Sequence, residues 1–320
     1  MIKKIITRDD ISLEAKITVP KGENIKNGAI IIVGGSDRID LDGNIGSIKL
    51  RTYEYLANYL CDMGYYTIRF NKRGIGNSSG SFYETGVTDL IEDIDAVYNF
   101  LLDGFEYELK KIYLLGHSEG SILATIYSSI NKNLSGLILL SGACLDLRTA
   151  QLRQFSFAAE ELKNLDGIMG KLIRTFYKSD KLVENQKSLY ETVLSSSKKS
   201  IKYKRKMIQA KWLREHLSYN KTTIKNYLAK ANMPIFASFG SKDIQSTSED
   251  MDELNAMKLN NITVKQIENL DHMLRDYKYS PTVVNQQKQY KYDSTLPLSE
   301  SLLNELHKWL DTNTCLEERI

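Results

Sequence analysis

Cysteine, histidine and long apolar runs are all scarce in this chain of 320 residues. The three cysteines (Cys61, Cys144 and Cys315) are odd in number and widely spaced, which argues against a disulfide framework and leaves no metal-binding pattern. The longest stretch without a charged side chain, residues 133–145, is too short to span a bilayer. Charged residues interrupt the segment after the basic start, so we expect no secretory signal. Together these absences predict a soluble, cytoplasmic protein.

The net charge of +3 is unevenly distributed. Residues 171–230 contain 16 Lys or Arg against 4 Asp or Glu, so the rest of the chain is net acidic. This asymmetry predicts a separate structural unit in that segment, which could attract anionic groups. The densest basic patch, residues 198–206, matches no nucleic-acid motif, and we interpret it as solvated helix faces. We therefore expect no nucleic-acid partner.

Apolar runs alternate with helical periodicities in the first part of the chain. The pattern of residues 11–19 suits an antiparallel edge strand. Repeated alternation of strand and helix predicts an α/β fold with a mainly parallel sheet and helices on both faces. Strands are expected over residues 11–19, 28–33, 66–70, 112–115 and 134–140, and helices over 49–63, 90–102 and 121–127.

The pattern changes between residues 146 and 232. Helical periodicities continue there without credible strands, over residues 155–165, 168–177, 186–194 and 201–217. Alternation resumes with strands over 235–239 and 262–267 and a final amphipathic helix over 299–310. The sequence therefore predicts a core in two parts, residues 1–145 and 233–320, with a helical cap, residues 146–232, inserted between them.

The peptide Gly-His-Ser-Glu-Gly at residues 116–120 is the most informative motif of the chain. It lies between a segment that predicts a strand and one that predicts a helix, which is the context of a nucleophile elbow. Gly116 and Gly120 leave space around a serine at a strained turn. Ser118 is therefore the candidate nucleophile.

A serine hydroxyl needs a base, and the chain offers four histidines. His117 adjoins the serine and would point away from it, His216 lies in the basic segment, and His307 lies on the polar side of the last helix. His272 directly follows an expected strand, where parallel α/β sheets carry their chemistry. We assign His272 as the base.

The carboxylate that orients this base is assigned to Asp243, which lies just past an expected strand. Asp250 and Asp252 fall in a segment with a helical pattern, and Asp271 is poorly placed to bond His272 because the two are adjacent. Serine, aspartate and histidine then occur in the chain order of one known triad arrangement.

An oxyanion hole needs two donors that are fixed in place. One is expected from the amide of Glu119, directly after the nucleophile. The other is expected from the glycine-rich loop at residues 34–36, where we favour Gly35 and keep Ser36 as a near neighbour. We expect the side chain of Glu119 to point away into a polar pocket, because a carboxylate facing the hole would oppose the oxyanion.

Several peptides of the chain form a recognisable set: Gly-His-Ser-Glu-Gly (116–120), Asn-Lys-Arg-Gly-Ile-Gly-Asn-Ser (71–78), Gly-Ser-Lys-Asp (240–243), Asp-His (271–272) and the loop at 34–44. With these peptides the chain resembles the α/β-hydrolase superfamily, specifically its bacterial esterase, lipase and aminopeptidase-like members with a helical cap. The resemblance implies an eight-stranded, mostly parallel sheet, with the insertion after the sixth strand folding over the site as a lid. Two departures are Val33, where the family usually has histidine, and Asn71, where it commonly has aspartate.

These residues and the resemblance together imply a serine hydrolase that cleaves a carboxylic ester through an acyl-enzyme intermediate, with no metal and no cofactor. The expected partner is a small-molecule ester or related acyl substrate, and the basic insertion could favour an anionic one. A thioesterase or acyltransferase, a peptidase, and a non-catalytic ligand-binding protein on the same fold stay open. We expect no membrane contact, although basic helices can lie on anionic surfaces, and the oligomeric state is left open.

Overall fold

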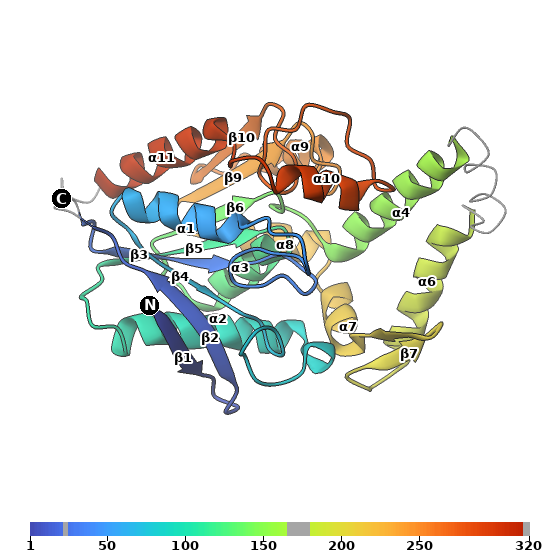
Figure 1. Cartoon of the computed structure of the whole chain (residues 1–320), viewed down its shortest axis with the longest axis horizontal. Coiled ribbons are helices and arrows are strands. Elements are labelled where there is room, and N and C mark those ends of the chain that lie inside the picture. Colours follow the sequence, from blue (N-terminus) through green and yellow to red (C-terminus); the bar gives the residue numbers. More distant parts are fainter. Residues whose placement is uncertain (22–24, 165–179, 316–320) are drawn as a thin grey trace.

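The computed structural model describes residues 1–21, 25–164 and 180–315. Eight strands form one sheet in the order β1-β2-β4-β3-β5-β6-β9-β10 (Figure 1). β1 and β2 are antiparallel to their neighbours and the other strand pairs are parallel, so the predicted mostly parallel α/β sheet is confirmed. The strands are β1 (Ile2–Ile6), β2 (Ser12–Thr18), β3 (Gly28–Val33), β4 (Tyr66–Phe70), β5 (Lys111–His117), β6 (Gly136–Leu140), β9 (Ile235–Gly240) and β10 (Ile262–Ile267).

Helices cover both faces of the sheet, as the alternation of strands and helices predicts (Figure 1). On one face, α1 (Thr52–Asp62) and α11 (Glu300–Cys315) share a core with Ile30 and Ile32 of β3. On the other face, α2 (Val87–Asp103) and α3 (Glu119–Ile130) share a core with Ile31 and Val33. Successive strand residues point to opposite faces, so a strand covered on both sides must be apolar throughout. No helix in the described part of the chain is long and apolar enough to cross a membrane.

The edge strands of the sheet are β1 and β10, and the expectation that residues 11–19 form an edge is wrong. β2 forms in that segment but lies between β1 and β4. β1 pairs with β2 from Ile2 opposite Lys16 to Ile6 opposite Ser12. Its two lysines fit an edge, where charged residues discourage further strand pairing. A strand of five residues with one buried side chain has too little periodicity to be found from sequence.

Between β6 and β9 the chain forms an insert that contains a hairpin as well as helices. The prediction of a helix over 201–217 without strands is wrong in its first half, because β7 and β8 pair there, so the basic patch lies on a hairpin. Lys204 and Arg205 at its tip have φ of 44° and 67°, which suits a two-residue hairpin turn. The helix expected over 168–177 lies outside the described residues. The insert comprises α4 (Leu147–Lys163), α6 (Asp180–Leu194), β7 (Ile201–Tyr203), β8 (Lys206–Ile208), α7 (Ala210–Ser218) and α8 (Lys221–Ala229).

The insert lies beside the edge of the sheet at which the parallel strands end (Figure 1). Its α4, α6 and α7 share a small apolar core that includes Leu147, Val193 and Leu213. In contrast, α8 packs Ile224 and Leu228 into the core of α2 and α3. The loops after β9 and β10 and the turn between β5 and α3 reach the same edge. The remaining elements are η1 (Phe82–Glu84), α9 (Ser248–Ala256) and α10 (Gln286–Asp293).

Candidate active site

Ser118 lies at a sharp turn between β5 and α3. Its φ of 56° and ψ of −122° are unusual for a residue with a side chain. A Cβ on Gly116 would lie 2.1 Å from the carbonyl oxygen of Gly120, and one on Gly120 would lie 2.1 Å from that of Val33. Only glycine fits these two positions, so the strained serine turn depends on the glycines that flank it.

Three side chains from separate loops form a continuous hydrogen-bonded row. His272 Nε2 lies 3.0 Å from Ser118 Oγ, and His272 Nδ1 lies 2.9 Å and 3.1 Å from the carboxylate oxygens of Asp243. Asp243 Oδ1 also accepts from the amides of Gln245 and Ser246 at 2.8 Å and 3.0 Å. The structure thus brings together the residues that the sequence assigns as nucleophile, base and orienting carboxylate.

The electrostatics of this row favour proton transfer from the serine. Burial opposes the ionised form of Asp243, but the interaction with His272 and the hydrogen bonds that Asp243 accepts outweigh burial and hold the pKa of this carboxyl below its usual value. An ionised carboxylate only accepts, so Nδ1 of His272 carries the proton that faces it. Nε2 is then an acceptor toward Ser118 Oγ.

His117 is buried and links two loops of the site. Its Nε2 donates to the backbone carbonyl of His272 at 2.7 Å, because a carbonyl oxygen only accepts. Its Nδ1 therefore accepts from the Tyr53 hydroxyl at 3.0 Å, and that hydroxyl accepts from the amide of Gly35 at 2.8 Å. Burial and the nearby His272 lower the pKa of His117 to about 3, so its ring stays neutral. His117 positions His272, a role that no local sequence signal indicates.

The loop after β3 leaves the amide of Ser36 free rather than that of Gly35. Gly35 lies against the nucleophile, since a Cβ on it would be 3.2 Å from Ser118 Cβ. The amide of Gly35 donates to the Tyr53 hydroxyl, however, and this hydrogen bond would have to break before the amide could donate to an oxyanion. The amides of Ser36 and Glu119 have no hydrogen-bond partner in the described part of the chain, and both residues line the cavity at Ser118.

The carboxylate of Glu119 points away from the serine into a buried polar cluster, as predicted. Its Oε2 accepts from Lys72 Nζ at 2.6 Å, and its Oε1 accepts from Trp212 Nε1 at 2.5 Å and His216 Nε2 at 2.9 Å. Lys72 Nζ also donates to the carbonyl of Gly35 at 2.6 Å. Burial alone would raise the pKa of Glu119, but Lys72 and His216 outweigh it and hold that pKa far below its usual value. The sequence analysis missed all three donors.

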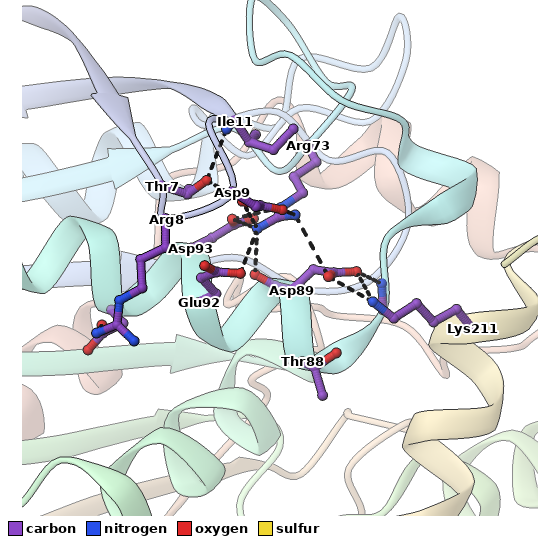
Figure 2. A network of polar contacts seen from close by, with 12 residues as sticks. Thr7, Arg8, Asp9, Ile11, Arg73, Thr88, Asp89, Glu92, Asp93 and Lys211 are labelled. Atoms are coloured by element: carbon purple, nitrogen blue, oxygen red, sulfur yellow. Dashed lines mark hydrogen bonds and ion pairs between the residues drawn. The ribbon is translucent and has the colours of Figure 1, made fainter.

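The insert helix α7 is attached to the core at a second place, the first turn of α2. Lys211 Nζ donates to both carboxylate oxygens of Asp89 at 2.7 Å, and the Glu215 carboxylate accepts from the amide of Thr88 at 2.9 Å. Figure 2 shows Asp89 between Lys211 and the guanidinium of Arg73. Because α7 carries Trp212, these contacts fix one wall of the site. Arg73 also pairs with Asp9, Glu92 and Asp93.

A cavity of about 300 Å³ opens at Ser118. The combination of apolar and amide side chains around it suits a small substrate with an apolar part and a hydrogen-bonding part. No group of His, Cys, Asp and Glu among the described residues is arranged to hold a metal ion. Apolar lining comes from Ile39, Ile45, Ile122, Leu145, Leu147 and Trp212, and amide lining from Gln151, Gln154, Gln209, Gln245 and Gln286.

A pair of buried acids supports the loop that carries His272. Asp271 accepts from the amide of Arg275 and from the side chain of Gln289 at 2.9 Å each. Burial and the charge of Asp271 raise the pKa of Asp293 to about 9. The charge of Arg275 opposes this rise but does not cancel it. Asp293 therefore keeps its proton at neutral pH.

Replacing Asp293 by asparagine should remove a pH dependence of stability. The pKa of Asp293 is higher in the folded protein than in the unfolded chain, where it is about 4. Its contribution to the free energy of unfolding is therefore full below about pH 4 and is lost as the pH rises toward the folded value. We expect the wild type to lose more stability than Asp293→Asn on going from about pH 5 to about pH 9. Urea midpoints across this range measure the difference, and equal losses would contradict the protonated state of Asp293.

Among the comparisons with known proteins, a family model shows the family and solved structures show the fold. A family model described as serine aminopeptidase, S33, matches residues 48–276. An uncharacterized protein of Acanthamoeba polyphaga mimivirus is 28% identical over 149 residues, 44% of this chain. The match spans 48% of that curated relative, about half of its length.

Solved structures with the same fold include three that cover nearly the whole chain. Est1E of Butyrivibrio proteoclasticus with ferulic acid bound is 17% identical with a TM-score of 0.58, over 91% of this chain and 96% of that one. The Pyrococcus furiosus esterase Pf2001 is 15% identical with a TM-score of 0.57, over 98% and 91%. Mouse alpha/beta hydrolase domain-containing protein 10 is 16% identical with a TM-score of 0.56, over 98% and 99%. At these identities the likeness shows a shared fold.

Proposed function

We propose, from the premise that the chain belongs to the serine aminopeptidase S33 family of α/β hydrolases, that it is a serine esterase. Family membership makes the chain a hydrolase. The proposal adds that the substrate is an ester and that three side chains form a catalytic triad. In it, Ser118 is the nucleophile, His272 is the base and Asp243 orients the base. The observation that carries the proposal is the hydrogen-bonded row of these three side chains at the wall of a cavity.

The proposed reaction has two steps. His272 Nε2 takes the proton of Ser118 Oγ as that oxygen attacks the ester carbonyl, and the amides of Ser36 and Glu119 donate to the oxyanion. The bond to the alcohol oxygen then breaks, that oxygen takes the proton from His272, and the acyl group stays on the serine. A water that gives its proton to His272 attacks the acyl-enzyme, and the serine regains a proton as the acid leaves. Asp243 stabilises the imidazolium throughout.

We further propose that residues 146–232 act as a cap on a core formed by residues 1–145 and 233–320. Side chains of α4 and α7 line the cavity at Ser118 together with core residues. The contacts of α7 with Glu119 and Asp89 hold this part of the cap against the core. A substrate would therefore contact both parts of the protein.

Two observations support a small ester as the substrate. The cavity has room for a compact acyl compound. Solved structures of the same fold include the Pyrococcus furiosus esterase Pf2001 and Est1E with ferulic acid bound. The same triad would also serve a thioester or an amide, so the leaving group is decided by comparing matched substrates.

Incubation with a fluorophosphonate tests the nucleophile directly. We expect one covalent adduct on the wild type and none on Ser118→Ala, measured by intact mass. Ser36→Ala is the matched control, because it removes a hydroxyl at the same cavity and keeps the backbone amide. It should be labelled like the wild type. An adduct on Ser118→Ala, or none on folded wild type, would contradict the proposal.

The same preparations then distinguish the leaving group. Acetyl, butanoyl and hexanoyl oxygen esters are compared with the corresponding thioesters and anilides. We expect the oxygen esters to have higher kcat/KM values than the anilides. If the thioesters or the anilides have the highest values, Ser118 is a nucleophile but the ester assignment is wrong.

A further inference from the structure

A carboxylate without a partner lies at the cavity, one residue beyond the proposed oxyanion donor Ser36. Asp37 lines both the cavity at Ser118 and the hollow outside it, and the residue is exposed to solvent. Its φ of 65° turns the chain at this point. Within the described residues Asp37 makes no ion pair and no side-chain hydrogen bond. Burial raises the pKa of this carboxyl above its usual value, while Lys72 opposes the rise. A cation in the cavity would favour the ionised form, so the carboxylate is available to a positively charged molecule there.

Nearby cations do not offset this charge. No lysine or arginine is among the described residues that line the cavity. Lys72 acts on Asp37 from a distance, but its ammonium lies 2.6 Å from the buried carboxylate of Glu119. Arg38 lines the outer hollow, where its guanidinium lies 5.4 Å from the centroid of the Phe82 ring. Among the described residues, a substrate at Ser118 thus meets the unpaired carboxylate of Asp37, the carboxylate of Glu119 that Lys72 already balances, and no lysine or arginine in the cavity wall.

The amide and phenol groups of the cavity are neutral, and the Glu119 carboxylate in its wall is paired with Lys72. Gln154 Nε2 lies 3.4 Å from Gln245 Oε1, and Gln245 Nε2 lies 3.3 Å from Tyr290 Oη. Burial raises the pKa of Tyr290 above its usual value, so its phenol stays uncharged. Amides and a phenol can bond a neutral or cationic group, but they cannot balance the charge of a substrate carboxylate that leaves water.

The basic residues of the insert do not change this balance. Lys202, Lys204, Arg205 and Lys206 are exposed on the hairpin of β7 and β8, and none of them lines the cavity. The attachment of α7 to α2, drawn in Figure 2, uses the ammonium of Lys211 for Asp89. These described basic residues of the insert therefore lie outside the cavity, and they give no support to a preference for anionic substrates.

We propose that Asp37 selects acyl substrates that carry a positive charge, such as an alkylammonium group, close to the reacting carbonyl, and disfavours those with a carboxylate there. The inference rests on the proposed function, because it concerns which compound reaches Ser118. A charge at the wall of a cavity acts strongly on its contents, since protein walls screen it less than water does. Asp37 adjoins Ser36, so it acts on the part of the substrate nearest the oxyanion.

The test uses the full-length protein and two pairs of esters that differ only in charge. Butanoylcholine and 3,3-dimethylbutyl butanoate differ by a quaternary nitrogen in place of a quaternary carbon in the alcohol. Benzyl 4-(trimethylammonio)butanoate and benzyl 5,5-dimethylhexanoate differ in the same way in the acyl group. The monobenzyl ester of pentanedioate adds a carboxylate. We expect kcat/KM to favour the cationic ester by about tenfold in at least one pair, and the anionic ester to be the slowest benzyl ester.

The variant Asp37→Asn should bring the ratio of cationic to neutral ester close to one. Asparagine tolerates positive φ, so the turn is retained. Asp62→Asn is the matched control, because it makes the same charge change at an exposed residue of α1 outside the cavity, and its ratio should equal that of the wild type. Equal rates within both pairs, or a ratio that Asp37→Asn does not change, overturn the inference alone. Absence of hydrolysis of every ester by folded protein overturns the proposed function and this inference with it.

Discussion

Replacing Ser118 by alanine or by glycine is expected to lower kcat/KM for ester hydrolysis by about 10⁴-fold or more, because neither variant has a nucleophilic oxygen. The two variants are expected to differ in stability. The φ of 56° and ψ of −122° at this position strain any residue with a Cβ, whereas glycine adopts them freely. Ser118→Gly should therefore have a free energy of unfolding ~1 kcal/mol higher than that of Ser118→Ala.

Urea unfolding followed by circular dichroism measures this difference, and a chromogenic ester measures the loss of activity. Ser121 provides the control pair, because it lies inside α3, where alanine is favoured over glycine. Ser121→Gly should thus be less stable than Ser121→Ala, the reverse of the order at position 118. The same order at both positions would show that the turn stores no strain. Near-normal activity in either variant at 118 would exclude this serine as the nucleophile.

Replacing Lys72 by methionine is expected to lower the free energy of unfolding by ~3–5 kcal/mol, because it leaves the carboxylate of Glu119 buried without its lysine. Lys72 and Glu119 are both largely inaccessible, with side chains 11% and 2% exposed. Activity should fall as well, since Lys72 also bonds the carbonyl of Gly35 in the loop that carries the proposed oxyanion donor. The double variant Lys72→Met/Glu119→Gln should recover much of the stability, because the charge that lost its partner is gone.

Urea midpoints of the wild type, Lys72→Met, Glu119→Gln and the double variant form a complete double-mutant cycle for the interaction between Lys72 and Glu119. Lys211→Met is the matched control, because it removes a lysine that pairs with Asp89 where both side chains are partly exposed. Such a pair contributes at most ~1 kcal/mol, so the control should lose much less stability. Equal losses for Lys72→Met and Lys211→Met, or no recovery in the double variant, would contradict the role given to Lys72.

Much of the fold and the row of three side chains could be predicted from sequence, because each depends on a local pattern. Buried parallel strands are continuous apolar runs, and β3 and β5 are found from such runs alone. Ser118 has glycines on both sides that its turn requires. Asp243 and His272 directly follow strands, and the ends of neighbouring parallel strands necessarily meet at one edge of the sheet.

The features that sequence analysis missed depend on contacts between distant residues. The three donors to Glu119 lie 47, 93 and 97 residues from it, and no local spacing connects them. The proposal of Ser36 rather than Gly35 as the second oxyanion donor rests on Tyr53, whose hydroxyl accepts from the amide of Gly35 and which lies 18 residues later in the chain. The hairpin of β7 and β8 has only three residues in each strand, so its basic sequence shows no periodicity that favours strand over helix.

The pairing of Glu119 with Trp212 and His216 has a consequence for anyone who builds chimeras of such enzymes. A foreign cap spliced onto this core would cover the cavity but would not bring an indole and an imidazole to the acid that follows the nucleophile. That acid would be left with Lys72 as its sole donor in the described part of the chain. Exchange of the cap therefore has to include α7, or has to be accompanied by a neutral residue in place of Glu119.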